Sequence, residues 1–118
     1  MKYLCLVYDD EALFDALPKD QFDSVLGEYF AVDHDLRRRD QMLGGEALQP
    51  ASTATLLRVR DGRVSLTDGP YMETKEQLGG FMLIEARDLD EAVTVMARIP
   101  RARMGCIEVR PILEFERP

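Results

Sequence analysis

A short segment near the middle of the chain concentrates residue types that bind ligands or transfer protons. Residues 66–81, LTDGPYMETKEQLGGF, lie between two apolar runs. Asp68 opens a turn, because Asp bonds its own downstream backbone, the following Gly accepts positive φ and the Pro fixes φ. Glu73 and Glu76 then bracket Lys75, which places two carboxylates beside an ammonium. This pattern suits proton transfer by Glu73 and charged contacts from its neighbours.

Two interpretations of this segment stay open. Loops on rigid scaffolds often carry chemistry, and this one is longer than the roughly two to five residues that a hairpin needs. A charged loop can equally be solvated, or be held by ion pairs against a neighbouring strand or subunit, and we expect it to be architectural before it is catalytic. The side chains that could contact a ligand are Asp68, Tyr71, Lys75, Glu76 and Arg110, with Arg110 as the expected counter-ion of a motif carboxylate.

The first predicted helix, from Pro18 to about Gln41, offers another candidate. At about 100° per residue, Asp33 falls within the apolar stripe formed by Phe22, Leu26, Tyr29 and Leu36. A carboxylate that faces a sheet costs free energy unless it is paired, and burial without a partner raises its pKa. Asp33 is therefore either a general base or a carboxylate satisfied by an arginine or a backbone amide.

The remaining pattern alternates strands with helices. Strands are predicted at residues 2–8, 46–48, 53–60, 63–67, 80–86 and 106–113. Asp61-Gly62 is a two-residue hairpin signal, and Gly44-Gly45 is expected to end the first helix. Asp88 is expected to cap a second helix over residues 89–99, which Pro100 ends. This order predicts one α+β domain over residues 1–118, ferredoxin-like βαββαβ with an added hairpin.

Length and charge exclude several classes of protein. A chain of 118 residues with 46% hydrophobic residues suits one soluble core, and no apolar run approaches the roughly 20 residues of a membrane span. The net charge of −7 opposes contact with nucleic-acid phosphates. The only two cysteines, Cys5 and Cys106, fall in predicted strands, which indicates buried thiols in a reducing cytoplasm. We find no metal-binding or cofactor-binding motif and expect neither group.

Several stretches resemble a known family. Asp68-Gly69-Pro70-Tyr71, followed by ETKE at residues 73–76 and LGGF at residues 78–81, closely resembles the DGPF-type branch of the YCII-related proteins. The opening MKYLCLVY, GGEAL at residues 44–48, LDEA at residues 89–92 and IEVRP at residues 107–111 agree with it. The resemblance spans essentially the whole chain. It implies a dimeric α+β barrel built from two ferredoxin-like subunits, but no established reaction.

The chain departs from this family at two positions. Tyr71 stands where the DGPF motif has Phe, which keeps the ring and adds a hydroxyl. YCII proteins proper resemble enzymes through a His on the first helix, and the residue near that position here is Tyr29. His34 lies more than one helical turn later and does not inherit the role. The resemblance therefore places Tyr29 among the catalytic candidates, with Asp33 and Glu73.

Two classes of function remain open. The first is a small cofactor-free enzyme or binding protein with a pocket between the first helix and the sheet, acting by proton transfer as a lyase or isomerase. The second is a non-catalytic regulatory dimer whose charged loop contacts a protein, since some relatives occur beside alternative sigma factors. In either case we expect a homodimer, because helices on one face leave the other apolar face of the sheet uncovered. A concave pocket holding Asp33 or Glu73 with a perturbed pKa would favour the first class, and motif side chains lying flat on a convex surface would favour the second.

Overall fold

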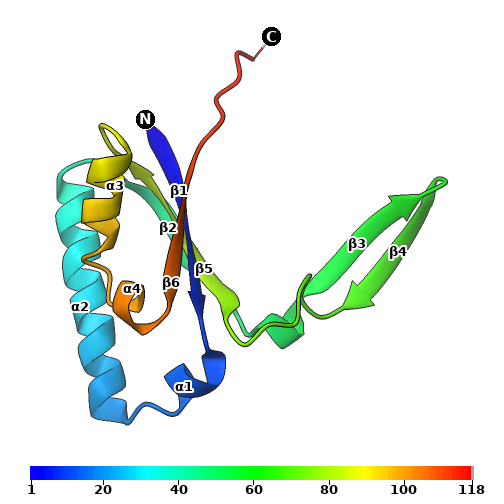
Figure 1. Cartoon of the computed structure of the whole chain (residues 1–118), viewed down its shortest axis with the longest axis horizontal. Coiled ribbons are helices and arrows are strands. Elements are labelled where there is room, and N and C mark those ends of the chain that lie inside the picture. Colours follow the sequence, from blue (N-terminus) through cyan, green and yellow to red (C-terminus); the bar gives the residue numbers. More distant parts are fainter. Residues whose placement is uncertain (118) are drawn as a thin grey trace.

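The computed structural model describes residues 1–117 and contains a four-stranded sheet with helices on one face (Figure 1). Its strands are β1 (Lys2–Asp9), β2 (Met42–Ala47), β5 (Gln77–Glu85) and β6 (Cys106–Pro111). They are arranged in the order β2-β5-β1-β6, and every neighbouring pair is antiparallel. The two main helices are α2 (Lys19–Arg38) and α3 (Leu89–Met96). The predicted ferredoxin-like α+β fold is confirmed.

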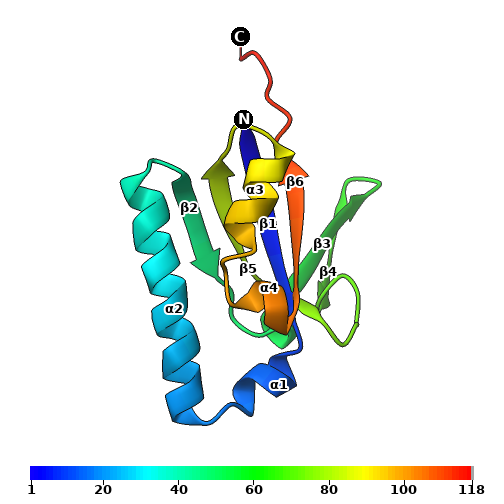
Figure 2. The ribbon, with the colours of Figure 1, turned by 60° about the vertical axis from the view of Figure 1, so that its left-hand side comes forward.

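Shorter elements join these strands and helices. They are α1 (Glu11–Asp15), a 3₁₀ turn η1 (Ala51–Thr53), β3 (Thr55–Arg60), β4 (Arg63–Asp68) and α4 (Arg101–Met104). Strands β3 and β4 form a separate two-stranded sheet, the predicted added hairpin. Its turn residues Asp61 and Gly62 have φ values of 51° and 75°, as a two-residue hairpin turn requires. The hairpin projects from the body on the side of the sheet away from α2 and α3 (Figures 1 and 2).

The alternation of β1 sets the two faces of the sheet. Tyr3, Cys5, Val7 and Asp9 are buried toward the helices, while the residues between them are half-buried on the opposite face. Three of these four side chains are hydrophobic, but the last is a carboxylate. The other buried hydrophobic residues of the core are Val32, Leu36, Met42, Met82, Ile84, Ala86, Ala92, Val95, Met96 and Ile99.

The end of α2 differs from the prediction. The helix stops at Arg38, and Asp40 adopts φ 57°, the left-handed conformation usually taken by glycine. The amide of Asp40 donates to the Arg37 carbonyl, and the amide of Gln41 donates to the Leu36 carbonyl. These two bonds form a Schellman motif, so the expectation that a glycine pair ends the helix was wrong.

The glycine pair instead lies inside β2, which is longer than the predicted strand at residues 46–48. A Cβ on Gly45 would lie 2.8 Å from the Phe81 carbonyl oxygen, and one on Gly80 would lie 2.9 Å from the Glu46 carbonyl oxygen. Both contacts are shorter than real Cβ atoms tolerate. Glycine therefore permits the close pairing of β2 with β5.

The two cysteines differ in exposure. Cys5 is buried in β1, and burial raises the pKa of its thiol to about 11, so the thiol stays protonated near neutral pH. Cys106, at the start of β6, is exposed, so the expectation of two buried thiols was wrong for this residue. Within residues 1–117, no helix combines the length and the apolarity needed to cross a membrane.

Candidate active site

A cavity of about 380 Å³ lies between α2 and the helix-covered face of the sheet. Its walls are largely apolar and include Val25, Leu26, Ile99 and Pro100. Five polar or charged residues also line it, which are Tyr29, Asp33, Arg37, Glu46 and Arg101. The predicted pocket between the first long helix and the sheet is therefore present. An apolar cavity with a few convergent polar groups is the usual form of a small-molecule site.

Helix α2 supplies three of these five residues. Tyr29, Asp33 and Arg37 are spaced four residues apart, so they share one face of the helix. Both carboxylate oxygens of Asp33 accept hydrogen bonds from Nε of Arg37, at 3.1 and 3.0 Å. The Asp33 side chain is only 17% exposed, which confirms the predicted orientation toward the sheet. Its partner is an arginine, which was one of the two alternatives for this carboxylate.

The hydroxyl of Tyr29 has a perturbed pKa. Burial raises this pKa, and the negative charge of Asp33 adds to the rise, while Arg37 and Arg101 oppose it. A tyrosine that keeps its proton acts as a hydrogen-bond donor to an oxygen in the cavity. The structure therefore brings together Tyr29 and Asp33, two of the three predicted catalytic residues.

A second carboxylate, Asp9, lies behind this cavity, next to the lining residues Gly79 and Arg101. It is 6% exposed and is the only charged residue that is buried within residues 1–117. Its Oδ2 lies 3.2 Å from Nη1 of Arg101, yet this buried oxygen accepts no well-aligned hydrogen bond. A buried carboxylate with spare acceptor capacity is costly, which is typical of functional sites.

The charge of Asp9 is disfavoured by its surroundings. Burial raises the pKa of its carboxyl group, and the Arg101 guanidinium opposes this rise. The negative charges of Glu11, Glu76 and Asp10 raise the pKa further. Glu76 belongs to the motif segment at residues 66–81, so this segment influences the pKa of Asp9 through the charge of one residue. A carboxyl group with a raised pKa is better matched to proton transfer near neutral pH.

Two elements position Arg101. Pro100 is buried at the start of α4, which fixes the backbone from which Arg101 extends. The guanidinium carbon lies 4.1 Å from the centre of the Phe14 ring on α1, a cation–π contact. Arg101 therefore lies between Asp9 and an aromatic face, and its side chain also lines the cavity.

Two glycines allow close approach to Asp9. A Cβ on Gly79 would lie 3.3 Å from Oδ1 of Asp9 and 3.4 Å from Nη1 of Arg101. Because Gly79 also lines the cavity, only a residue without a side chain separates the carboxylate from the cavity on this side. A Cβ on Gly105 would overlap the Tyr8 carbonyl oxygen and would lie 3.2 Å from Cβ of Asp9. Because Gly105 has no side chain, the backbone just before β6 packs directly against Tyr8 and Asp9.

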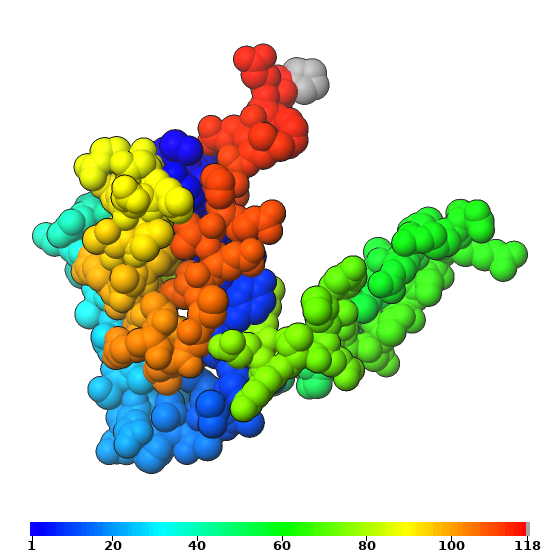
Figure 3. Space-filling view, in the orientation of Figure 1, coloured from blue at the N-terminus to red at the C-terminus, as the bar shows by residue number. Residues whose placement is uncertain are grey.

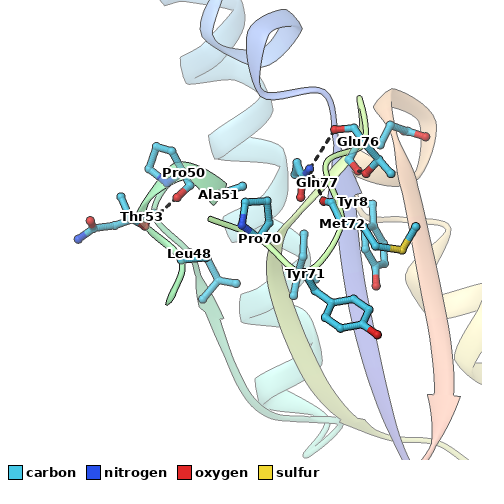
Figure 4. Close-up of a pocket in the computed structure, with 14 residues that line it drawn as sticks. Tyr8, Leu48, Pro50, Ala51, Thr53, Pro70, Tyr71, Met72, Glu76 and Gln77 are labelled. Atoms are coloured by element: carbon cyan, nitrogen blue, oxygen red, sulfur yellow. Dashed lines mark hydrogen bonds between the residues drawn. The ribbon is translucent and has the colours of Figure 1, made fainter. Parts of the chain in front are cut away.

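The motif side chains lie apart from this cavity. Tyr71 and Glu76 line a different hollow of about 670 Å³, together with Leu48, Pro50 and Met72 (Figure 4). Tyr71 is 78% exposed, and Glu73 is also exposed. The side-chain amide of Gln77 holds the loop, because its Nε2 donates hydrogen bonds to the backbone carbonyls of Met72 and Thr74. Of the motif, only Gly79, Gly80 and Phe81 border the cavity.

Within residues 1–117, Lys75 and Arg110 pair with carboxylates that lie outside the motif. Nζ of Lys75 lies 4.0 Å from Oδ2 of Asp10, and Arg110 lies 3.7 Å from Glu108 on its own strand. The expectation that Lys75 or Arg110 neutralises a motif carboxylate was therefore wrong. Within residues 1–117, the carboxylate of Asp68 accepts no hydrogen bond. The turn depends instead on Gly69, which has φ 103° and donates to the Ala54 carbonyl at 2.7 Å.

His34 is exposed on α2 and does not line the cavity. We therefore expect His34→Ala to change ligand affinity by less than about threefold, because a group without ligand contact contributes little to binding. Isothermal titration of the variant against the wild type measures this. A loss of a hundredfold or more would show that His34 belongs to the site.

Sequence analysis missed Asp9, Arg101 and Arg37. The alternation of β1 carried a signal, since Asp9 continues the inward positions of Tyr3, Cys5 and Val7. A carboxylate in an inward position of a strand is unusual and indicates a partner or a role. Arg101 gave no comparable signal, because its contacts to Asp9 and Phe14 join residues far apart in the chain.

Comparison with known proteins agrees with this fold. The family model of the YCII-related domain matches residues 1–116. The uncharacterized protein R00369 of Rhizobium meliloti (strain 1021) is 35% identical over 118 residues, which cover 98% of this chain and 95% of that protein.

A solved structure is also similar to the whole chain. It is 5-chloro-2-hydroxyhydroquinone dehydrochlorinase (TftG) from Burkholderia phenoliruptrix AC1100, in complex with 2,5-dihydroxybenzoquinone. The match has a TM-score of 0.60 at 14% identity and covers 98% of this chain and 96% of that one. At this identity the likeness shows a shared fold. The family model and the relative at 35% identity show that the chain belongs to the YCII-related family.

Proposed function

We propose that this protein is a small enzyme that binds a compact, oxygen-substituted ring compound between α2 and the sheet and transfers a proton on it. The observation that carries the proposal is Asp9, a buried carboxylate with a raised pKa that lies directly behind two residues of the cavity lining, Gly79 and Arg101. Its partner Arg101 faces the same cavity. The reaction class that fits is a lyase or isomerase step that needs an acid–base group and an oxyanion partner.

The cavity offers positive charge for an anionic oxygen. Arg101 and Arg37 both line it, and a guanidinium keeps its charge at all physiological pH values. Tyr29 adds a hydroxyl donor from the same side of the cavity as Arg37. An enolate or phenolate oxygen bound by these donors would be stabilised as its charge develops.

Asp9 is the group suited to move the proton. Its pKa is raised by burial and by neighbouring carboxylates, so the protonated and ionised forms differ less in free energy near neutral pH than for an exposed Asp. Gly79, which lines the cavity, has no side chain between the carboxylate and the cavity. Asp33 is less suited, because Arg37 already satisfies both of its oxygens. We assign Asp33 the role of positioning Arg37.

The structural neighbour supports the choice of substrate class. That protein is a dehydrochlorinase of a hydroxylated ring and was solved with 2,5-dihydroxybenzoquinone. A planar ring of this size fits a cavity of about 380 Å³ with apolar walls and charged donors. The same compound is therefore a suitable probe for this protein.

We expect 2,5-dihydroxybenzoquinone to bind the wild type and to bind Arg101→Met at least tenfold more weakly, because the variant lacks the charge that holds an anionic oxygen. The matched variant is Arg110→Met, which removes an exposed arginine from β6 outside the cavity. Amide chemical-shift mapping during titration measures both affinity and location. Equal weakening in the two variants, or shifts confined to the hollow around Tyr71, would contradict the proposed site.

The second class of function, a regulatory dimer whose loop contacts a protein, stays a prediction. The exposed Tyr71 and Met72 are compatible with it, but they border a hollow and do not lie on a convex surface. The cavity with its perturbed groups supports the first class.

A further inference from the structure

Helix α1 contributes no buried residue to the structure. It lies on the surface at one end of the molecule, beside the start of α2 (Figures 2 and 3). Its aromatic residue, Phe14, is half-buried, yet within residues 1–117 it belongs neither to the buried core nor to the hydrophobic residues packed against that core. Core packing therefore does not explain why this helix carries a phenylalanine.

Two side chains contact the Phe14 ring. The ring of Phe22 on α2 meets it edge-to-face, with 5.4 Å between the ring centres and 70° between the ring planes. Pairs of this geometry are favourable and directional, so the contact fixes the orientation of the Phe14 ring. The guanidinium of Arg101 lies over the same ring, with its carbon 4.1 Å from the ring centre. The electron-rich face of an aromatic ring attracts such a cation.

The Arg101 guanidinium has few other constraints on its position. In the described part of the chain its nitrogens donate no well-aligned hydrogen bond, and its charged partner is Asp9 at 3.2 Å. An arginine side chain has about 2 kcal/mol of rotamer entropy to lose before it holds one position. Arg103, two residues later, is held differently, because two of its nitrogens donate to the two carboxylate oxygens of Glu28. Arg101 therefore keeps its donors free for a ligand, and its orientation depends on the Phe14 ring.

Polar contacts hold the start of α1 in place without Phe14. The Asp10 side chain accepts a hydrogen bond from the Ala12 amide and so caps the helix. The Glu11 side chain accepts a hydrogen bond from the Ala51 amide at 2.8 Å, which joins α1 to η1. Because neither contact involves the ring, a substitution of Phe14 leaves the start of the helix attached.

We propose that Phe14 is a positioning residue, whose ring holds the Arg101 guanidinium beside Asp9 and at the wall of the cavity. Both Phe14 and Arg101 line this cavity. Phe14 acts on the reaction only through Arg101, so this role rests on the proposed function. It gives α1 a purpose that packing does not, because the helix carries the ring on which the cation of the site lies. Leucine in place of Phe14 would keep an apolar side chain but would lack the electron-rich face.

The pKa of the Asp9 carboxyl group, followed by carbon NMR during a pH titration without ligand, tests this role. Burial raises this pKa, and the Arg101 guanidinium opposes the rise. Neighbouring carboxylates add to the rise, which are Glu11, Glu76 and Asp10. We expect Phe14→Leu to raise the pKa of Asp9 further, by at least about 0.5 pH units, because a guanidinium that leaves the ring spends less time beside the carboxylate. Phe14→Tyr keeps the ring and should stay within about 0.2 pH units of the wild type.

Leu13→Ala is the matched variant on the same helix, because Leu13 is 65% exposed and does not line the cavity. It should leave the pKa of Asp9 within about 0.2 pH units of the wild type. If Phe14 served packing alone, Phe14→Leu would lower the melting temperature and leave the pKa of Asp9 unchanged, and that result would overturn the proposal. An equal rise of this pKa in Leu13→Ala or in Phe14→Tyr would overturn it too.

Binding of 2,5-dihydroxybenzoquinone separates the role of Phe14 from the proposed function. We expect Phe14→Leu to bind this compound at least about fivefold more weakly than the wild type, and Phe14→Tyr to stay within about twofold. Equal affinities of Phe14→Leu and a wild type that binds would overturn the positioning role. A wild type that does not bind the compound would contradict the proposed function, and the pKa of Asp9 would still decide the role of Phe14.

Side-chain relaxation in the wild type provides a test that needs no variant. We expect the Nε–H group of Arg101 to have an order parameter above about 0.7, because the ring restrains the guanidinium. Arg110 is the reference, since its side chain is 67% exposed, and its order parameter should lie below about 0.5. An Arg101 side chain as mobile as that of Arg110 would overturn the proposal, even if Phe14→Leu failed to fold.

Discussion

Asp9→Asn is expected to stabilise the fold at neutral pH while abolishing function. The wild-type carboxylate is buried, its pKa is raised above the ordinary value of 3.8, and one of its oxygens accepts no hydrogen bond. The amide of Asn has the same shape but no charge to desolvate. Arg101 tolerates the loss of its partner, because its side chain is 27% exposed and contacts the Phe14 ring. Residues that a site needs often cost stability in this way.

The raised pKa of Asp9 determines how the stability difference between Asp9→Asn and the wild type changes with pH. A carboxyl group whose folded pKa lies above its unfolded pKa contributes stability below 3.8 and loses it as the pH rises through the folded value. The asparagine variant lacks this loss. Its advantage in free energy of unfolding should therefore be largest near pH 7, at about 1.4 kcal/mol for each unit of pKa rise, and should vanish near pH 3.8.

Urea denaturation between pH 4 and pH 8 measures this difference. Asp61→Asn is the companion variant, because Asp61 lies in the exposed hairpin turn, where Asn-Gly is as favourable as Asp-Gly. Its free energy of unfolding should stay within about 0.5 kcal/mol of the wild type. An Asp9→Asn variant that is less stable than the wild type at pH 7 would mean that the ion pair with Arg101 contributes more free energy than the desolvation of the carboxylate costs.

For function, we expect any turnover of the Asp9→Asn variant to fall at least a hundredfold.

Gly105→Ala is expected to produce the largest loss of stability of any single methyl added to this chain. The new Cβ would overlap the Tyr8 carbonyl oxygen, and the backbone fixes the positions of both atoms. The entry to β6 must therefore move away from β1, which costs more than about 2 kcal/mol. For a domain of this size, that lowers the melting temperature by roughly 8 °C or more.

Gly27→Ala is the matched substitution for this effect. Gly27 lies within α2, and no atom lies within 4 Å of the position of its Cβ. Alanine there should raise the free energy of unfolding by about 0.5–1 kcal/mol, because glycine is a poor helix former. Thermal denaturation measures the melting temperatures of both variants against that of the wild type. A melting temperature for Gly105→Ala within 2 °C of the wild type would be incompatible with the described contact between β1 and β6.

Sequence patterns predicted the fold where the controlling interactions are local. The alternation of β1 and the Asp61-Gly62 turn depend on neighbouring residues, and both were confirmed. The end of α2 was misplaced because Asp40, and not a glycine, adopts the left-handed conformation. Gly45 serves a contact with Phe81 across the sheet, which no local pattern reveals.

The candidate site was predicted in part. Helical periodicity placed Asp33 and Tyr29 on the correct face of α2, since the spacing of residues on a helix fixes their direction. The charged residues after Asp68 were emphasised for their composition, yet the structure places them beside another hollow. The ion pair of Asp9 with Arg101 joins the first strand to the last helix, so only the folded chain reveals it.

A crystal structure of the protein soaked with 2,5-dihydroxybenzoquinone tests the central claim most directly. We predict density for the ring between α2 and β5, with one of its oxygens within hydrogen-bond distance of the Arg101 guanidinium and its edge next to Gly79 and Asp9. Density for the ring in the hollow between Leu48 and Tyr71, with an empty cavity beside Arg101, would contradict the account.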